Sequence, residues 1–434
     1  MSRLFKLFAA HAISVSAAVF CFVPLAGEIF AAPILAAATR TSAFASTSTA
    51  SVPVPIRDDG TTSLKFATAA PNESVVVIYN AECALAAARG TRLSIKIVVD
   101  GNEAEPSSGT DFTFCSALDS SGNTWASPVR QSVLKVPLSG THTVRVVARL
   151  VGGSGEWRLD DSSLVVQPAL GTFATREDAY KSTDTNWNQL PIFQDGGEIL
   201  DFSTSAANER VKITYNAECV LAAGEPWQYV DSWISIYSAG ASAGNLCNAV
   251  DSTGQTWAGA ARQFAVTIPA AGSYTAVVAG RLSSSPGTWR IDDSSLVITK
   301  HVLASTVNDT VFLSSSTTEV AVPIISGGGT ALQFSTAKSN QQVKLSYNAL
   351  CAIMGERGRW LGLRLVVDGV EAAPASGFDF ALCSSVAPLN YYYFTGFRQS
   401  VITVPNAGIH NAQVFARASG MANWYLGQQS LIVE

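Results

Sequence analysis

The sequence predicts an all-β protein made of three tandem jelly-roll-like antiparallel β-sandwich domains, each with one internal disulfide. The motif Tyr-Asn-Ala-x-Cys occurs three times, starting at Tyr79, Tyr215 and Tyr347, and the copies lie one domain length apart. Short segments of alternating polarity, bounded by Gly, Pro and Asn, recur in every copy and are typical of strands. Apart from Cys21, the seven cysteines fall two to each copy.

Residues 1–45 are predicted to be a signal peptide and linker. A short basic start precedes an apolar run over 7–27, and small-residue cleavage candidates follow at 36–38 and 43–45. An uncleaved membrane anchor is the alternative, because the apolar run approaches the length of a bilayer span. We expect a secreted protein, extracellular or at the cell surface, with the periplasm as an alternative compartment. We expect no membrane span after signal removal.

The rest of the chain divides into repeat 1 at 46–168, repeat 2 at 169–301 and repeat 3 at 302–434. Two cysteines per repeat in an exported chain predict one bridge inside each, whereas two thiols without a nearby His do not make a zinc site. Closing a loop of about 30 residues should stabilise each repeat by roughly 3–4 kcal/mol. The expected pairs are Cys83–Cys115, Cys219–Cys247 and Cys351–Cys383.

The repeated motif itself lies on a predicted strand. In repeat 2 the residues that share one face with the motif's Tyr and Cys are apolar, and those between them are polar, which is the period of a half-buried strand. The apolar set is Val211, Ile213, Tyr215, Ala217 and Cys219. Tyr and Cys should therefore point into the core, Asn should point away from it, and the bridge should join two strands through the interior.

Further strands are expected in the same order in each repeat. In repeat 1 they are 93–99, 111–115, 130–136, 141–149 and 157–165. The first ends at Asp100-Gly101, a tight-turn signal, and no segment has a convincing helical period. This many short strands with Gly/Pro turns indicates a β-sandwich. The Cys…Trp…Cys spacing of immunoglobulin domains is absent, which favours a jelly roll.

Arginines recur at two places in every repeat, and we interpret them as structural. A buried guanidinium needs carbonyl or carboxylate partners, so these side chains should tie loop ends together. The alternative is that they bind an anion or a sugar. They are Arg130, Arg262 and Arg398 at the first place, and Arg149, Arg281 and Arg417 at the second.

An aspartate pair recurs in the last strand of the first two repeats, as Asp160-Asp161 and Asp292-Asp293. Carboxylate oxygens suit Ca²⁺, although adjacent residues of a strand point to opposite faces. Salt bridges to the repeated arginines are the alternative. Repeat 3 has no such pair, so any calcium is expected in repeats 1 and 2 only.

The text around the second pair, 291–296, resembles the last strand of secreted jelly-roll carbohydrate-binding modules, and 137–144 resembles their penultimate strand. The resemblance covers a limited part of each repeat. It implies a carbohydrate-binding role and a structural calcium near the last strand.

Aromatic residues form a third feature. Trp125, Trp257 and Tyr393 lie in polar loops after the second Cys of each repeat, where a ring suits the apolar face of a sugar. The alternative is a ring folded back over the core. Trp233 and Tyr237 occupy outward positions of a strand in repeat 2, which suggests an interface with a ligand or a neighbouring domain.

Catalysis finds no support in the sequence, because the four His show no recognisable arrangement with Ser, Cys or carboxylates. A net charge of −5 without a basic stripe argues against nucleic acid as a partner. We expect a non-catalytic protein that binds polysaccharide or a cell-surface component through its tandem modules, with no cofactor other than calcium. The alternative is a structural envelope or adhesin-stalk protein without a small-molecule ligand.

Overall fold

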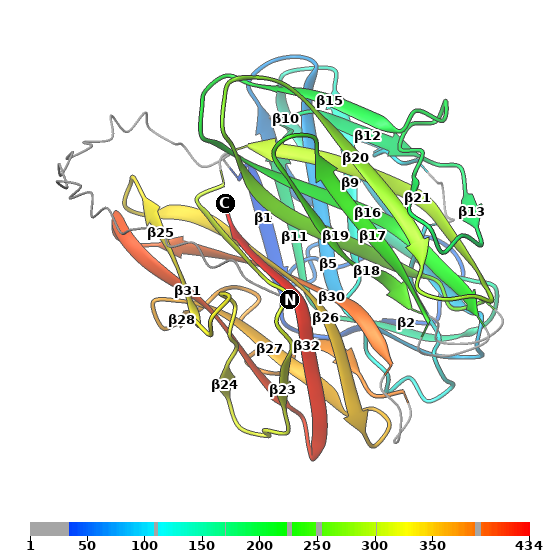
Figure 1. Ribbon diagram of the computed structural model, residues 1–434. Coiled ribbons are helices and arrows are strands. Elements are labelled where there is room, and N and C mark those ends of the chain that lie inside the picture. Colours follow the sequence, from blue (N-terminus) through cyan, green and yellow to red (C-terminus); the bar gives the residue numbers. More distant parts are fainter. Residues whose placement is uncertain are drawn as a thin grey trace, which may run out of the picture.

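The computed structural model describes residues 34–107, 112–169, 171–223, 228–248, 254–300, 302–386 and 392–434, and Figure 1 shows the chain. Within these ranges all regular elements are β-strands, so no helix there is long and apolar enough to cross a membrane. Each repeat forms two antiparallel sheets that enclose a hydrophobic core of its own. The prediction of an all-β chain with three tandem sandwiches is confirmed. We call the sandwiches modules 1, 2 and 3.

Each module has an inner sheet, which faces the other modules, and an outer sheet. The inner sheet of module 1 contains β1 (Ala36–Arg40), β2 (Phe44–Ser46), β5 (Glu73–Ala87), β9 (Val129–Val136) and β11 (Gly155–Pro168). Its outer sheet contains β3 (Val52–Pro53), β4 (Leu64–Thr68), β6 (Arg92–Val99), β7 (Asn102–Glu103), β8 (Thr113–Ser116) and β10 (Gly140–Val151).

Modules 2 and 3 repeat this topology. The inner sheet of module 2 contains β12 (Phe173–Arg176), β13 (Tyr180–Ser182), β16 (Glu209–Ala223), β19 (Ala258–Ile268) and β21 (Gly287–Lys300). Its outer sheet contains β14 (Asn188–Gln189), β15 (Ile199–Thr204), β17 (Tyr229–Ile236), β18 (Gly240–Asn248) and β20 (Gly272–Leu282). The inner sheet of module 3 contains β22 (Ala304–Asn308), β23 (Phe312–Ser314), β26 (Gln341–Gly355), β30 (Tyr393–Val404) and β32 (Ala422–Val433). Its outer sheet contains β24 (Val320–Ala321), β25 (Ala331–Thr336), β27 (Trp360–Val367), β28 (Val370–Glu371), β29 (Ala381–Ser384) and β31 (Gly408–Ala418).

Module 1 begins earlier than we expected. Strand β1 pairs with β11 from Ala36 opposite Val166 onward, as β12 pairs with β21 and β22 pairs with β32 in the other modules. Residues 36–46, which we assigned mostly to the leader and linker, therefore belong to the sandwich. Small alanine side chains serve equally well in a strand and near a signal-peptide cleavage site, so the pattern was ambiguous. Residues 1–33 of the expected leader lie outside the described residues.

The motif strands behave as predicted on their core face. Tyr79, Tyr215 and Tyr347 are fully buried on β5, β16 and β26. The expected disulfides are confirmed, with Cα–Cα distances of 6.4, 6.1 and 6.1 Å for Cys83–Cys115, Cys219–Cys247 and Cys351–Cys383. Each bridge joins the inner sheet to the outer sheet of its module.

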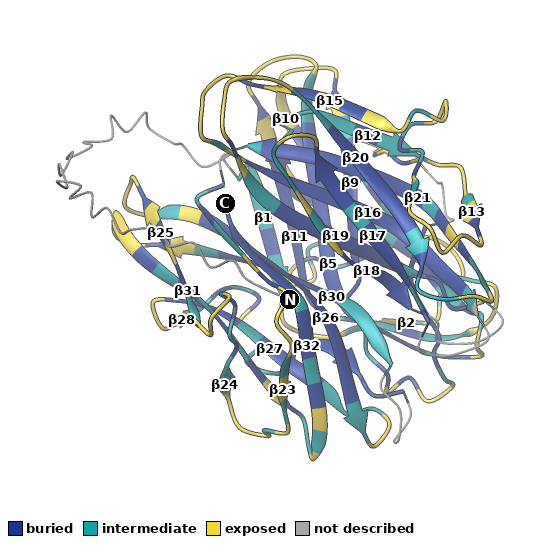
Figure 2. Cartoon of the chain, viewed as in Figure 1, coloured by how far each residue is buried: buried dark blue, intermediate teal, exposed yellow. Residues whose placement is uncertain are grey.

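The opposite face of the motif strand contacts another module. Asn216 Nδ2 donates to Val129 O of module 1 at 2.9 Å, and Asn348 Nδ2 donates to Ala261 O of module 2 at 3.0 Å. Asn80 Nδ2 closes the circle by donating to Phe397 O of module 3 at 2.9 Å. The modules therefore form a closed ring in which each module contacts both others in an equivalent way. Figure 2 shows that the strands at the centre of the ring, among them β16, β19 and β26, are buried along most of their length.

This arrangement does not match the extended row of spacers that a stalk interpretation expects. The three inner sheets share an apolar contact that includes Val76, Val133, Ala261, Val297 and Phe397. Burial of apolar side chains between modules drives such packing. The outer sheets lie on the far side of each module, although their strands β8, β18 and β29 reach a neighbouring module through Ser116, Asn245 and Leu382.

A buried charge cluster also lies between the modules. Glu434 Oε2 contacts Lys212 Nζ of module 2 at 2.5 Å and Lys344 Nζ of its own module at 2.8 Å. Gln167 Oε1 of module 1 accepts a further hydrogen bond from Lys344 Nζ. Burial raises the Glu434 pKa, but the two ammonium groups outweigh it and lower the pKa to about 2. Burial lowers the pKa of Lys344 to about 7.

Candidate functional site

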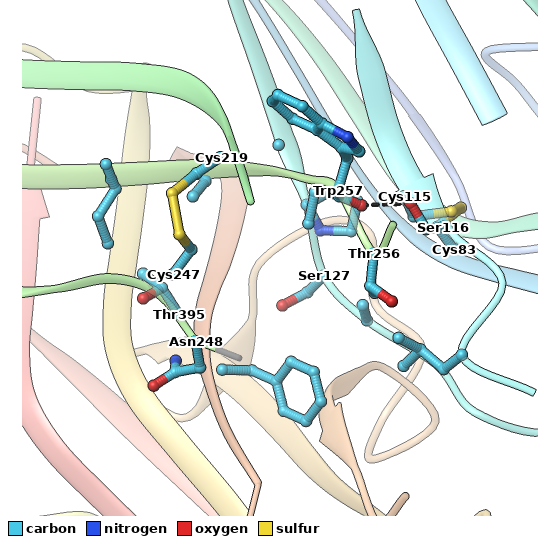
Figure 3. A pocket seen from close by; sticks show the side chains of 18 of the residues that line it. Cys83, Cys115, Ser116, Ser127, Cys219, Cys247, Asn248, Thr256, Trp257 and Thr395 are labelled. Carbon is cyan, nitrogen blue, oxygen red and sulfur yellow. Dashed lines mark hydrogen bonds between the residues drawn. A yellow bond between two sulfur atoms is a disulfide. The ribbon is translucent and has the colours of Figure 1, made fainter. Parts of the chain in front are cut away.

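A small pocket lies where the first residues of β9, β19 and β30 meet. Equivalent residues of all three modules line it, namely Ser127, Gly259 and Thr395. Ser116 Oγ donates to Trp257 O at 2.5 Å and Ser127 Oγ donates to Leu382 O at 2.7 Å, so the pocket wall is tied across modules (Figure 3). The cavity volume is about 60 Å³, which holds a few water molecules but is small for a sugar ring.

The three aromatic residues predicted from the loops have different surroundings. Trp257 and Tyr393 line this pocket, and Trp125 is not part of its lining. Trp257 is 9% exposed and its ring faces the Arg290 guanidinium, whose Cζ lies 5.2 Å from the ring centroid. Tyr393 packs edge-on against Tyr425 with ring centroids 5.3 Å apart. The backbone amide of Trp125, whose side chain is half-buried, donates to Ser384 Oγ of module 3 at 3.0 Å. The rings are packed at module contacts and do not form one open sugar-stacking cleft.

A more open aromatic surface covers the outer sheet of module 2. Trp187 is 38% exposed, and its ring centroid lies 6.2 Å from that of Trp233 on β17, with the two ring planes inclined by 52°. Tyr237, directly after β17, is 47% exposed. We call these three residues the aromatic platform. Trp233 lies on a strand of the sheet, whereas Trp187 directly precedes β14 and Tyr237 directly follows β17.

Polar groups surround the aromatic platform. The Arg281 guanidinium lies 4.5 Å from the Trp187 ring centroid, and its Nη2 contacts Asp231 Oδ2 at 3.2 Å. Gln189 Nε2 donates to the Tyr237 hydroxyl oxygen at 3.1 Å. Planar rings flanked by fixed donors and acceptors can stack on a ligand and bond its hydroxyl groups.

A shorter disulfide loop accompanies the open surface of module 2. Its two cysteines are separated by 28 residues, against 32 in each of the other modules. In module 3 the longer segment places Phe378 over the outer sheet, 5.2 Å from Arg364 Cζ and 4.7 Å from Arg417 Cζ. Gly362 makes room for it, because a Cβ there would lie 2.3 Å from Phe378 O. In module 2 the equivalent segment pairs with β17 as strand β18, so the sheet is extended and stays uncovered.

The other modules carry different side chains at the platform positions. Counting along the equivalent strands, Trp187 and Trp233 correspond to Glu319 and Arg364 of module 3, which form an ion pair at 3.0 Å. In module 1 the corresponding residues are Ser51 and Lys96. Outward parity identified Trp233 and Tyr237 in the sequence. Trp187 was missed because it lies in a polar turn just before β14. The only sequence signal for it is an aromatic residue among polar neighbours.

The repeated arginines make contacts with the backbone. Arg130 and Arg398 are fully buried, and their Nη2 atoms donate to Pro106 O at 2.5 Å and to Pro374 O at 2.8 Å. Arg262 is 4% exposed and its Nη2 donates to Ala243 O at 3.0 Å. Burial lowers the pKa of all three to about 10, so they remain charged at neutral pH. In the second set, Arg281 and Arg417 stack on aromatic rings as described above, and Arg149 lies on β10 opposite Ser94.

The aspartate pairs lie on a bulge of the last inner strand. Asp161 and Asp293 have φ angles of 42° and 44°, are buried, and interact with Glu82 and Glu218, the fourth residue of the motif in modules 1 and 2. Asp160 and Asp292 are half-buried. Calcium takes about six to eight oxygen ligands. Among the residues that the structure describes, no group of three or more His, Cys, Asp or Glu side chains is placed to hold a metal ion, and the calcium site stays a prediction.

Comparison with known proteins adds little to this site. No family model matches the chain, and no curated protein matches it. Among solved structures, the tandem CBM22 domains of Xyn10C from Paenibacillus barcinonensis are 12% identical, with 62% of this chain and 98% of that chain covered and a TM-score of 0.17. PNGF-II is 9% identical, with 83% and 99% covered and a TM-score of 0.24. The VP2 subviral particle of infectious bursal disease virus is 11% identical, with 92% and 82% covered and a TM-score of 0.17. Similarities at these TM-scores carry no argument about function.

Proposed function

We propose that this chain is a secreted, non-catalytic protein that binds polysaccharide, free or on a cell surface, through the aromatic platform of module 2. The observation that carries the proposal is the Trp187–Trp233 pair on the outer sheet of module 2, in which Trp187 is 38% exposed and Trp233 is half-buried. A pyranose has an apolar face that suits an aromatic ring, and its hydroxyl groups suit the neighbouring Asp231, Arg281 and Gln189 side chains. The disulfides suit an oxidising compartment outside the cytosol.

The closed ring of three modules carries this surface on one module. Modules 1 and 3 carry Ser51, Lys96, Glu319 and Arg364 where module 2 has its two tryptophans. One chain therefore offers one platform, and tandem repetition does not multiply it. The inter-module contacts hold the platform on a stiff support, which lowers the conformational entropy lost on binding.

The test is a titration of the full chain against a panel of soluble polysaccharides by calorimetry or affinity electrophoresis. Trp187→Ala and Trp233→Ala should each weaken binding by about tenfold or more, which corresponds to about 1.4 kcal/mol of lost contact. Binding to no member of a broad panel, or unchanged binding by both variants, would overturn the proposal.

Module 3 supplies a matched control. The double variant Trp187→Glu with Trp233→Arg places the Glu319–Arg364 ion pair of module 3 on the same sheet. It should keep the melting temperature close to that of the parent and abolish binding. Retained binding by a folded double variant would show that the rings do not form the site.

A further inference from the structure

The pocket at the meeting point of the three modules has an uncharged wall. Among the described residues that line it there is no Asp, Glu, Lys, Arg or His. The lining is mainly apolar and includes two disulfides and three leucines, namely Cys83–Cys115, Cys219–Cys247, Leu118, Leu246 and Leu382. Because burying a charge without a partner is costly, the pocket suits a neutral group.

One buried donor in the pocket wall has no acceptor among the described residues. Asn248 lines the pocket next to the Cys219–Cys247 bridge and is 9% exposed (Figure 3). Its Oδ1 accepts from Asn245 Nδ2 at 3.4 Å, which leaves Nδ2 as the group without a partner. Buried polar groups are nearly always hydrogen-bonded, so an unused donor in the wall of a cavity points to a ligand that brings an acceptor.

The equivalent residues of the other modules are serines that bond across a module contact. Ser116, Asn248 and Ser384 each directly follow the second Cys of their module. Ser116 Oγ donates to Trp257 O of module 2, and Ser384 Oγ accepts from the Trp125 amide of module 1. Asn248 replaces this hydroxyl by a longer amide side chain and presents a donor to the pocket instead.

Hydroxyl groups in the same wall can accept a hydrogen bond in return. Thr395 Oγ1 donates to Asn245 O at 2.9 Å, and Ser116 Oγ donates to Trp257 O at 2.5 Å. A hydroxyl oxygen has two lone pairs besides its donor, so both oxygens can still accept from an N–H group. The pocket therefore combines a free amide donor, hydroxyl acceptors and an apolar wall.

The size of the pocket limits what it can hold. Its volume is about 60 Å³, and each water-sized group needs roughly 10–15 Å³, so it has room for about four heavy atoms. An acetamido group has this size. Its carbonyl oxygen matches the Asn248 donor, its N–H matches the hydroxyl acceptors, and its methyl group matches the apolar wall. Because the pocket is partly open to solvent, such a group can enter while it stays attached to a larger molecule.

We propose that this pocket binds the acetamido group of an N-acetylated sugar, with Asn248 Nδ2 donating to the carbonyl oxygen. The acetamido group follows from the pocket alone, whereas a polysaccharide as its carrier rests on the proposed function. The pocket shares no residue with the aromatic platform and is therefore a second site. Since residues of all three modules line it, the bound group contacts the closed ring and stabilises it against opening.

Free acetamide tests the pocket without the platform. In the full chain with isotope-labelled asparagine, the NMR signals of the Asn248 side-chain amide are identified by their absence in Asn248→Ser. Acetamide should shift them saturably at millimolar concentrations, because so few heavy atoms bind weakly. Acetate should bind about tenfold or more weakly, because no cation in the described lining meets its charge. No saturable shift with acetamide, or equal binding of acetate, would overturn the proposal, and the first result would leave water as the occupant of the pocket.

Two matched trisaccharides test the carrier by calorimetry. The linear trimer of N-acetylglucosamine should bind about tenfold or more tightly than the glucose trimer of the same linkage, which has hydroxyl groups in place of the acetamido groups. Equal binding of the two trimers by a chain that binds acetamide would overturn the sugar as carrier and would indicate an amide group of a protein instead. Failure of the platform would leave the acetamide result unchanged, so the two proposals can fail separately.

Modules 1 and 3 supply the control variant. Asn248→Ser copies Ser116 and Ser384, and it should abolish the preference for the N-acetylated trimer while the melting temperature stays close to that of the parent. Asn248→Leu has a similar size without a donor and should give the same result if Asn248→Ser fails to fold. A preference that persists in a folded variant would overturn the role of Asn248.

Discussion

The Gln131 backbone amide donates to Asn216 Oδ1 at 2.9 Å across the contact between modules 1 and 2. The Asn216 side chain also donates through Nδ2 to Val129 O and to Ala260 O. Strand β9 ends the strand order of its inner sheet, so no further strand of that sheet pairs with Gln131 and Val129 on its open side. Asn216 pairs these groups and so covers an edge that would otherwise be open to other strands.

Replacing Asn216 with Ala should therefore destabilise the chain. Three backbone groups would lose a partner in a buried contact, at about 1–3 kcal/mol for each group that stays unpaired. Denaturant unfolding should show a loss of roughly 3 kcal/mol or more, because water cannot easily replace all three bonds. Asn186→Ala, at an exposed position of the same module, is the control and should change little. Equal unfolding midpoints for the two variants would contradict the role of Asn216.

The buried charge cluster gives a second prediction. Glu434→Gln removes the carboxylate between Lys212 and Lys344 and leaves two ammonium groups facing each other. Removing one partner of a buried ion pair costs about 3–5 kcal/mol, and urea unfolding should show a loss of this size.

Module 1 suggests how to reverse that loss. Its equivalents of Lys344 and Glu434 are Val76 and Gln167. The triple variant Lys212→Val, Lys344→Val, Glu434→Gln removes every charge of the cluster and should lie within about 1–2 kcal/mol of the parent, because apolar replacements of buried ion pairs are often near neutral. A triple variant as unstable as Glu434→Gln would show that the cluster contributes through more than charge balance.

Acid stability gives a third prediction. His142 Nδ1 lies 2.6 Å from Asp100 Oδ2, and His410 Nδ1 lies 2.6 Å from Asp368 Oδ2. Burial raises the pKa of both aspartates, but hydrogen bonds from the His ring and a backbone amide outweigh it, so the net pKa is lowered. Acids with a lowered pKa contribute stability above the ordinary pKa of about 3.8 and lose it as pH falls below that value.

The double variant Asp100→Asn with Asp368→Asn should therefore lose less stability than the parent between pH 5 and pH 2. Thermal melts over this range provide the measurement. Asp201→Asn is the control, because Asp201 accepts from Thr275 Oγ1 in module 2 and has no His partner. If Asp201→Asn reduces the loss of stability at acid pH as much as the double variant does, the His–Asp pairs do not cause that loss.

Strand parity predicted the core of this protein well and its module contacts poorly. The burial of Tyr79 and Cys83 follows from an alternation that depends on the strand alone. The same alternation predicted that Asn80 points away from the core of its module. It could not show whether water or another module lies on that side. What covers that face is set by residues over 300 positions away, such as Phe397, with a sequence separation of 317.

The candidate site was predictable only where it follows a strand. Trp233 and the neighbouring Tyr237 were found from the parity of β17, whereas Trp187 precedes β14 in a turn that has no period to read. The aromatic platform is exposed because strand β18 stands where module 3 has a segment that covers its outer sheet. In the sequence, this difference is marked only by the shorter spacing of the two cysteines in module 2. For Trp257 the sequence signal was misleading. Its polar loop suggested an exposed ring, but the ring is packed at a module contact.

The bond between Asn80 and Phe397 also has a consequence during biosynthesis. A ribosome releases modules 1 and 2 before module 3, so the Asn80 face of the nascent chain waits uncovered until the last strands have been made. Two chains made close together can exchange third modules in that interval, because the faces are the same in each copy. Synthesis at high local concentration should therefore yield dimers and longer oligomers with exchanged modules, and slower translation or a chaperone that shields module 1 should suppress them.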